Sequence, residues 1–269
     1  MRTVVPVTVT EGFPFVPASI GGTPVTMLLD TGSDGMLVTP EVAAALQLPP
    51  DPGRSTRLLG TGGSRDAPNV MLRGLRIGTA ALSTLSVPVL ALPLVPRTEP
   101  ALAGLLGAPL LADYDLDLDV PRGRMTLLTG CGAPGPDMTP LPLTVQDGQV
   151  LAPVWVNGVA LLALLDTGSR ATILTAPAAA RAGLGRSPSS ANTARGVDGA
   201  PLAIGHARAR SLQLGERTMT DVPVSIAPLA LGRADMVLGL DQLGQRRVVI
   251  SYRTRRAWIG PIAEPPSAD

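Results

Sequence analysis

The sequence predicts an all-β protein made of two similar β-barrel lobes, each with one short helix, related by a pseudo-two-fold axis. Three observations predict this class: many short aliphatic runs, turn residues spread along the whole chain, and an internal repeat. The chain has 269 residues, which is enough for two small domains. Its 30 glycines and 28 prolines separate the aliphatic runs and do not gather in one tract, as is typical of many short strands.

The aliphatic and β-branched runs between these turns predict the strands. In the first half they are Thr3–Thr10, Val25–Leu29, Gly74–Ile77, Leu85–Leu90, Leu116–Val120 and Arg124–Leu128. In the second half they are Val154–Val156, Ala160–Leu165, Ser211–Leu214, Val222–Ile226, Val248–Tyr252 and Ala257–Ile259. Two segments predict helices, "PEVAAALQL" from Pro40 and "APAAARAGL" from Ala176, because each has proline in its first turn and an alanine-rich continuation.

The two halves of the chain repeat one another throughout. "TPVTMLLDTGSDGMLVTPEVAAALQL" aligns with "GVALLALLDTGSRATILTAPAAARAGL", which places Asp30 and Asp166 136 positions apart. Later glycines, Gly107 and Gly239, are 132 positions apart, so loop lengths differ while the order of elements is kept. We expect an N-terminal lobe over residues 1–129, a Gly/Pro-rich linker over 130–138 and a C-terminal lobe over 139–269.

Composition argues against several classes of function. The formal charge is +1 and only 16% of residues are charged, so no strong field attracts nucleic acid or an anionic membrane. The basic pair Arg246 and Arg247 is expected at a solvated strand edge. One cysteine, Cys131, and one histidine, His206, are too few for a disulfide or a multi-histidine metal cluster. We therefore expect no metal ion, no organic cofactor and a monomer, with His206 structural or exposed.

Each copy of the Asp-Thr-Gly-Ser motif follows a Leu-Leu pair, and residues equivalent in two packed halves meet near the pseudo-axis. Asp30 and Asp166 are therefore candidates for a facing carboxylate pair. At ~3 Å and an effective dielectric of about 20, two carboxylates would repel by about 5 kcal/mol, so they should share one proton. The ionised member can accept a proton from water while the protonated member polarises a carbonyl. This chemistry predicts peptide hydrolysis without a covalent intermediate.

The remaining positions of both motifs are expected to support the pair. The glycines permit close approach of backbone amides, the threonines can hydrogen-bond across the axis, and the serines can hydrogen-bond the outer carboxylate oxygens. These residues are Thr31, Gly32 and Ser33 in the first copy and Thr167, Gly168 and Ser169 in the second.

At these residues the chain resembles the aspartic proteases of the retropepsin-like and pepsin-like superfamily, over nearly everything from Val4 to Gly260. In that family an apolar-apolar-Gly motif packs beneath each active-site loop. "LLG" at Leu105–Gly107 and "VLG" at Val237–Gly239 match it. The resemblance implies that Asp30 and Asp166 are the catalytic residues.

Two glycine-rich segments, "LLGTGGS" from Leu58 and "ARGVDGA" from Ala194, resemble the flaps of retropepsins. A pepsin-like flap tyrosine is missing, which favours a fused retropepsin dimer over a pepsin with one flap. The resemblance implies that five flap residues contact the substrate: Gly60, Thr61, Gly62, Gly196 and Val197.

The position after each motif differs between the halves, with Asp34 in the first and Arg170 in the second. Asp34 matches the aspartate that contacts the substrate backbone in retropepsins. One interpretation is that both residues only shape their loops. The other is that they make the cleft electrically asymmetric and orient the peptide.

The predicted function is an aspartic endopeptidase that acts on peptides or unfolded proteins. One alternative is a peptide-binding or protein-binding module of the same fold without activity. Another is a structural duplicated barrel in which the aspartates cap turns and lie far apart. The Ala-, Arg- and Pro-rich composition with little Lys suits a bacterial protein. The first residues, "MRTVVPVTVTEG", are typical of a strand and turn and not of a signal peptide. We expect a periplasmic or secreted location if an export signal was removed, and a cytoplasmic one otherwise.

Overall fold

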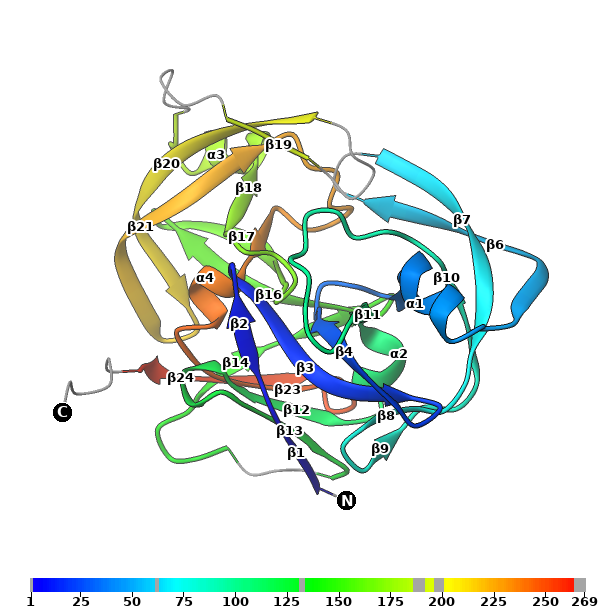
Figure 1. Ribbon diagram of the computed structural model, residues 1–269. Coiled ribbons are helices and arrows are strands. Elements are labelled where there is room, and N and C mark those ends of the chain that lie inside the picture. Colours follow the sequence, from blue (N-terminus) through cyan, green and yellow to red (C-terminus); the bar gives the residue numbers. More distant parts are fainter. Residues whose placement is uncertain (1, 61–62, 131–133, 186–191, 196–200, 264–269) are drawn as a thin grey trace.

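Two lobes of β-structure stand on a shared sheet in the computed structural model, which describes residues 2–60, 63–130, 134–185, 192–195 and 201–263 (Figure 1). The first lobe, in blue and cyan, occupies the right of the view, and the second lobe, in green to orange, the left. The prediction of an all-β protein with two repeated lobes is confirmed.

The first lobe contains a seven-stranded and a three-stranded sheet. The larger sheet has the order β5 (Leu37–Val38), β11 (Leu102–Leu106), β4 (Thr23–Leu29), β3 (Phe13–Ile20), β8 (Leu75–Ile77) and β9 (Ala80–Ala81), with β2 (Thr8–Thr10) also paired to β3. The smaller sheet has the order β10 (Leu85–Pro88), β7 (Gly63–Leu72) and β6 (Pro50–Gly60).

One eight-stranded sheet forms the second lobe. Its order is β15 (Thr144–Gln146), β16 (Gln149–Val156), β17 (Val159–Leu165), β22 (Met236–Leu238), β18 (Ile173–Thr175), β21 (Arg217–Ala227), β20 (Pro201–Leu214) and β19 (Asn192–Arg195). Because β16 also pairs with β20, the sheet closes on itself as a barrel.

A six-stranded sheet at the base combines strands from both halves. Its order is β1 (Arg2–Pro6), β13 (Arg124–Leu128), β12 (Asp115–Asp119), β23 (Arg246–Ser251), β24 (Arg256–Ile262) and β14 (Thr139–Pro142), with the 3-10 turn η1 (Val120–Arg122) between β12 and β13. The central pair, β12 and β23, is antiparallel and comes from equivalent places in the repeat. Strands from both halves share this sheet, so it marks no boundary between the lobes. The proposed lobe limits stay a prediction.

The expected solvated edge at Arg246 and Arg247 is wrong, because β23 lies inside the base sheet. Arg246 is only 1% exposed and donates to the Gln242 carbonyl at 3.2 Å. Arg247 forms a two-pronged ion pair with Asp117, with both nitrogen–oxygen distances 2.8 Å. This ion pair connects the two halves of the molecule.

Each lobe has two short α-helices among its described residues, so the expectation of one helix per lobe is wrong. The predicted pair is present as α1 (Pro40–Ala45) and α3 (Ala176–Arg181), capped by the Thr39 and Thr175 hydroxyls. The additional helices, α2 (Ala108–Leu111) and α4 (Leu240–Leu243), follow the two late glycines. They have only four residues each, too few for a helical repeat to stand out in the sequence.

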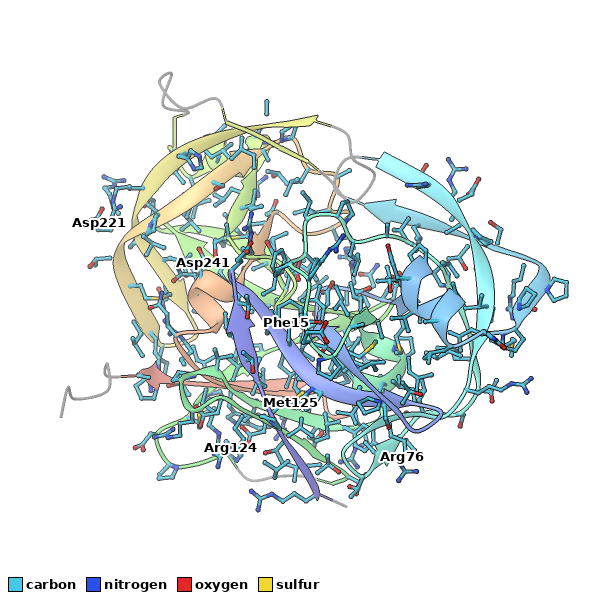
Figure 2. All side chains as sticks on the ribbon, viewed as in Figure 1. Phe15, Arg76, Arg124, Met125, Asp221 and Asp241 are labelled. Atoms are coloured by element: carbon cyan, nitrogen blue, oxygen red, sulfur yellow. The ribbon has the colours of Figure 1, made fainter. Side chains whose placement is uncertain are left out.

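A main hydrophobic core runs through the molecule, and side chains fill the interior of both lobes (Figure 2). Two smaller clusters lie apart from it, one per lobe. The first contains Phe13, Phe15, Leu28, Leu37, Leu90 and Leu105, and the second Leu151, Leu164, Ala227, Leu229, Ala234 and Val237. In β4, Met27 and Leu29 belong to the main core and Leu28 to the smaller cluster. Both faces of β4 are therefore covered, which accounts for the continuous apolar run before Asp30.

Candidate active site

Asp30 and Asp166 stand at the ends of equivalent buried strands. β4 pairs in parallel with β11, and β17 pairs in parallel with β22. The Asp30 amide donates to the Leu106 carbonyl at 3.0 Å, and the Asp166 amide donates to the Leu238 carbonyl at the same distance. These bonds extend both parallel ladders by one residue, so the sheets fix where each carboxyl group projects.

The loops that follow Asp30 and Asp166 exchange hydrogen bonds through their threonines. The Thr31 hydroxyl donates to the Leu165 carbonyl at 2.8 Å and accepts from the Thr167 amide at 3.1 Å. The Thr167 hydroxyl donates to the Leu29 carbonyl at 2.8 Å and accepts from the Thr31 amide at 3.1 Å. Both side chains are buried. The reciprocal set holds the two loops in one fixed relation across the pseudo-axis.

The late glycines lie directly against these loops. A side chain at Gly107 would overlap the Gly35 carbonyl, and one at Gly239 would overlap Ala171. The amides that follow these glycines complete the contact: Ala108 donates to the Ser33 carbonyl at 3.1 Å and Leu240 to the Ser169 carbonyl at 2.7 Å. Each lobe therefore supports its loop from beneath by the same pair of interactions.

The carboxyl groups of Asp30 and Asp166 touch. They lie close enough that the charge of Asp166 acts directly on Asp30. A Cβ atom on Gly32 would overlap the Asp166 carboxyl group, and one on Gly168 would overlap that of Asp30. The interpretation in which the aspartates cap turns far from each other is therefore wrong. The pair is also partly exposed, so solvent reaches it.

Burial raises the pKa of Asp30 well above its usual value, and the charge of Asp166 raises it further. Burial also raises the pKa of Asp166, against hydrogen bonds that favour its ionised form. Those bonds come from Asp30 and from the Gly168 and Ser169 amides, the amides at 2.8 and 3.1 Å. Both shifts disfavour the doubly ionised state, so the two groups share one proton and titrate as a pair.

The serine hydroxyls do not bind the carboxylates as expected. Ser33 donates its hydroxyl to the Gly35 carbonyl at 3.2 Å, and Ser169 donates to the Ala171 carbonyl at 2.9 Å. Short polar side chains readily form hydrogen bonds with the backbone two residues away. Here each serine hydroxyl bonds to such a backbone carbonyl and not to the aspartate carboxylate. The serine hydroxyls shape their loops, and Ser169 binds the Asp166 carboxylate through its amide.

The predicted flaps fall on two β-hairpins, β6 with β7 and β19 with β20 (Figure 1). Gly60 ends β6, while Thr61, Gly62, Gly196 and Val197 lie outside the described residues. Leu58 of the first hairpin packs on the smaller cluster of its lobe, and Ile204 of the second packs on the other. Both hairpins are thus anchored to apolar groups that neighbour the aspartate strands.

Asp34 and Arg170 are both exposed on their loops. Arg170 reaches the first lobe, where its guanidinium carbon lies 5.2 Å from the centre of the Phe13 ring. Asp34 lies against Gly148 of the second lobe, at a turn equivalent to the one that carries Gly12. Both residues therefore sit where the lobes meet.

Sequence reasoning missed Asp241, which braces the second loop. Its carboxylate accepts from the Thr172 amide at 3.0 Å and from the Thr172 hydroxyl at 2.7 Å. The same hydroxyl accepts from the Gly239 amide at 3.2 Å. The first half has Met36 and Pro109 at the equivalent positions, so the repeat gave no signal for this brace.

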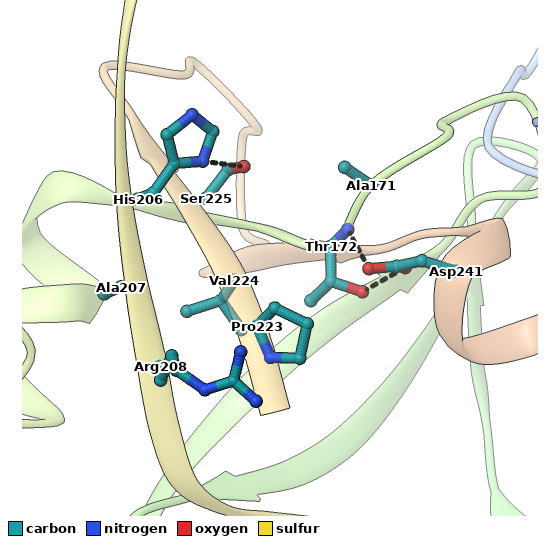
Figure 3. Close-up of a pocket in the computed structure, with 9 residues that line it drawn as sticks. All are labelled: Ala171, Thr172, His206, Ala207, Arg208, Pro223, Val224, Ser225 and Asp241. Carbon is teal, nitrogen blue, oxygen red and sulfur yellow. Dashed lines mark hydrogen bonds between the residues drawn. The ribbon is translucent and has the colours of Figure 1, made fainter. Parts of the chain in front are cut away.

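His206 lies at a surface pocket of about 650 Å³, on the opposite wall from Thr172 and Asp241 (Figure 3). Its Nδ1 atom is 3.5 Å from the Ser225 hydroxyl oxygen. Both Asp241 carboxylate oxygens are bonded to Thr172, so Asp241 does not complete a serine–histidine–aspartate relay. Among the described residues, no group of three or more His, Cys, Asp or Glu side chains is placed to hold a metal ion.

A family model for aspartyl proteases matches the chain twice, over residues 16–110 and 152–242. The chain belongs to the aspartyl protease family. Each match contains one Asp-Thr-Gly motif, one late glycine and the strands that carry them. No curated protein shows significant sequence similarity to the chain. Within the described part of the chain, no helix is both long and apolar enough to cross a membrane.

Proposed function

We propose that the protein is an aspartic endopeptidase in which Asp30 and Asp166 activate water against a peptide bond. The observation that carries this proposal is the close carboxyl pair at the ends of two equivalent strands, with each carboxyl group against the glycine of the other loop. Two contacting carboxyl groups disfavour the doubly charged state, and a fold would not need them for stability alone. The pair provides an acid and a base in one place.

The proton-sharing pair supplies one acid and one base, and the proposed cycle starts with the proton on Asp30. Asp166, the ionised member, accepts a proton from the attacking water while Asp30 donates its proton to the substrate carbonyl oxygen. The product of this step is a neutral tetrahedral diol. Asp166 then gives its proton to the amide nitrogen as the carbon–nitrogen bond breaks, and Asp30 recovers a proton from a diol hydroxyl. The pair returns to its starting state, and no covalent intermediate with the enzyme forms.

The surroundings of the pair favour an extended peptide with apolar residues beside the cleaved bond. Leu28 and Leu164 lie two positions before the aspartates and belong to the two smaller apolar clusters. The flap hairpins pack on the same clusters through Leu58 and Ile204. A peptide between the hairpins and the aspartates can add backbone hydrogen bonds in strand fashion.

The test is proteolysis of a denatured protein mixture between pH 3 and 7, with and without a pepstatin-like inhibitor. The proposal predicts cleavage by the wild type that the inhibitor blocks. Asp30→Asn and Asp166→Asn should each lose activity while staying folded, and the exposed Asp113→Asn variant serves as the matched control. Full activity in either site variant would refute the assignment.

The competing proposal is a module that captures peptides without cutting them. It predicts that wild-type protein retains labelled peptides intact at every pH and that Asp30→Asn binds them as well as the wild type. Contact between the two carboxyl groups argues against it, because peptide capture alone does not require a proton-sharing pair. Mass spectrometry of the recovered peptides separates the two outcomes.

A further inference from the structure

Arg170 is held across the lobe boundary, and its charge has no ion-pair partner among the described residues. Its aliphatic stem lies against the Gly12 turn, where an added Cβ would be 3.2 Å from the Arg170 Cγ and Cδ atoms. Its guanidinium group stacks near Phe13, with 5.2 Å to the ring centre. The side chain is exposed and forms no ion pair within the described residues. The position is thus fixed while the charge remains available.

The equivalent position in the first lobe has the opposite charge. Gly148 approaches Asp34 as Gly12 approaches Arg170, with an added Cβ 3.2 Å from the Asp34 Cα atom. The two turns match in backbone as well, since Glu11 and Asp147 before these glycines have φ angles of 51° and 50°. Two turns of one shape therefore hold an anionic and a cationic group on either side of the aspartate pair.

The contact between the lobes does not require the charge of Arg170. Gln149 is the counterpart of Phe13, and its side-chain amide donates to the Gly32 carbonyl at 3.4 Å. The neutral Gln149 thus links the second lobe to the first loop. At the other boundary, stacking on Phe13 orients the guanidinium plane. Its N–H edges bond to none of the described residues, so they can receive a carboxylate. An arginine edge binds a carboxylate in a two-pronged, charge-assisted way that a lysine cannot reproduce.

We propose that Arg170 is a specificity-determining residue that binds a carboxylate of the substrate on one side of the scissile bond, while Asp34 favours a cationic group on the other side. This inference rests on the proposed peptidase function and names the substrate class: peptides with opposite charges flanking an apolar core. The carboxylate can come from an acidic side chain or from the free end of a short peptide. Both sources offer the same two oxygens to the guanidinium edge.

The experiment compares matched peptides that share one cleavable apolar core. Glu, Gln or Lys is placed at successive positions on each side of the scissile bond, and each peptide is made with a free and with an amidated carboxyl end. For wild-type protein we expect kcat/KM to be about tenfold higher with Glu than with Gln at one position. If the free end supplies the carboxylate, amidation lowers kcat/KM to a similar extent in a peptide cut close to that end.

Variants of Arg170 separate specificity from a purely structural role. Arg170→Gln should abolish the preference for Glu over Gln, Arg170→Lys should restore only part of it, and Arg170→Glu should favour Lys. Arg210→Gln, which removes an exposed arginine of β20, should keep the wild-type preference. A structural role alone would lower kcat/KM for all peptides equally. Equal ratios in the wild type and in Arg170→Gln would overturn the inference.

Failure of the peptidase proposal can be told apart from failure of this inference. Cleavage of every peptide without a charge preference keeps the peptidase and removes the role of Arg170. Where no peptide is cut, fluorescence anisotropy with the Asp166→Asn background still gives the ratio of the Kd values for Glu and Gln peptides. The inference is supported if the Asp166→Asn protein binds Glu and Gln peptides with different Kd values and the added Arg170→Gln change makes these values equal. It is overturned if the Asp166→Asn protein with Arg170 intact already binds both peptides with the same Kd.

Discussion

Thr31 and Thr167 each bind the strand that carries the other half's aspartate. Four hydrogen bonds of 2.8 to 3.1 Å connect the two residues and the carbonyls of Leu29 and Leu165. All of these bonds cross between halves that are separated by more than a hundred residues. The candidate active site and the junction between the lobes are therefore one structure.

Replacing either threonine by valine should destabilise the whole molecule. Thr31→Val keeps the shape but leaves the Leu165 carbonyl and the Thr167 amide without partners, which should cost about 2–4 kcal/mol of unfolding free energy. Thr31→Ser keeps the hydroxyl and should lose less than half as much. Urea unfolding followed by circular dichroism measures both variants. Equal stability of the valine and serine variants would contradict this account of the junction.

Asp30→Asn should stabilise the fold at neutral pH. The pKa of Asp30 is raised in the folded state, so folded protein holds a proton that the unfolded chain, with a pKa of about 4, releases. The resulting stability is complete below that value and is lost as pH rises through the folded pKa. Asparagine removes the repulsion. Thermal melts should show a higher Tm for Asp30→Asn than for the wild type near pH 7 and little difference at pH 3. An increase in Tm that does not depend on pH would speak against charge repulsion.

Gly32→Ala should disrupt the pair, because its Cβ atom would overlap the Asp166 carboxyl group. We expect at least a hundredfold loss of kcat/KM, since a displacement of about 1 Å at reacting groups has that effect. Gly35→Ala in the same loop is the control, because its Cβ would meet no atom within 4 Å. The prediction fails if the two alanine variants hydrolyse a reporter peptide at the same rate.

Asp241→Ala should loosen the second active-site loop. It removes two hydrogen bonds to Thr172, so unfolding free energy should fall by about 1–3 kcal/mol and kcat should fall with it. Asp241→Asn keeps one carbonyl acceptor and should lie between the alanine variant and the wild type. Hydrogen exchange of the Thr172 amide reports the loop directly. Unchanged exchange in Asp241→Ala would rule out the brace.

The internal repeat allowed the two central residues of the candidate site to be predicted from the sequence. Asp30 and Asp166 follow matching apolar runs, so symmetry alone placed them opposite each other. Other features had no local signal. β3 was not predicted because Pro14 and Pro17 interrupt its pattern, although Phe15–Ile20 pair with β4. The burial of Arg246 depends on contacts with Gln242, Met219 and β24, which no local sequence pattern reveals.

The sequence identified the two residues that make the candidate site asymmetric, but it did not predict their contacts. Asp34 and Arg170 are visible as a mismatch between the motifs. The stacking of Arg170 near Phe13 arises where a loop of one lobe meets a turn of the other, and no periodicity connects them. Similarly, the serine hydroxyls had two suitable acceptors, and only the loop geometry decides that Ser33 bonds to Gly35.

The pH dependence of kcat/KM for a cleavable apolar peptide tests the central claim most directly. Hydrolysis needs one proton on the Asp30–Asp166 pair, so the wild type should give a bell-shaped profile whose upper limb falls as the second carboxyl ionises. Asp166→Asn should abolish the whole profile and not merely shift it. A wild-type rate that keeps rising to alkaline pH, or a profile that survives in Asp166→Asn, would contradict catalysis by a proton-sharing aspartate pair.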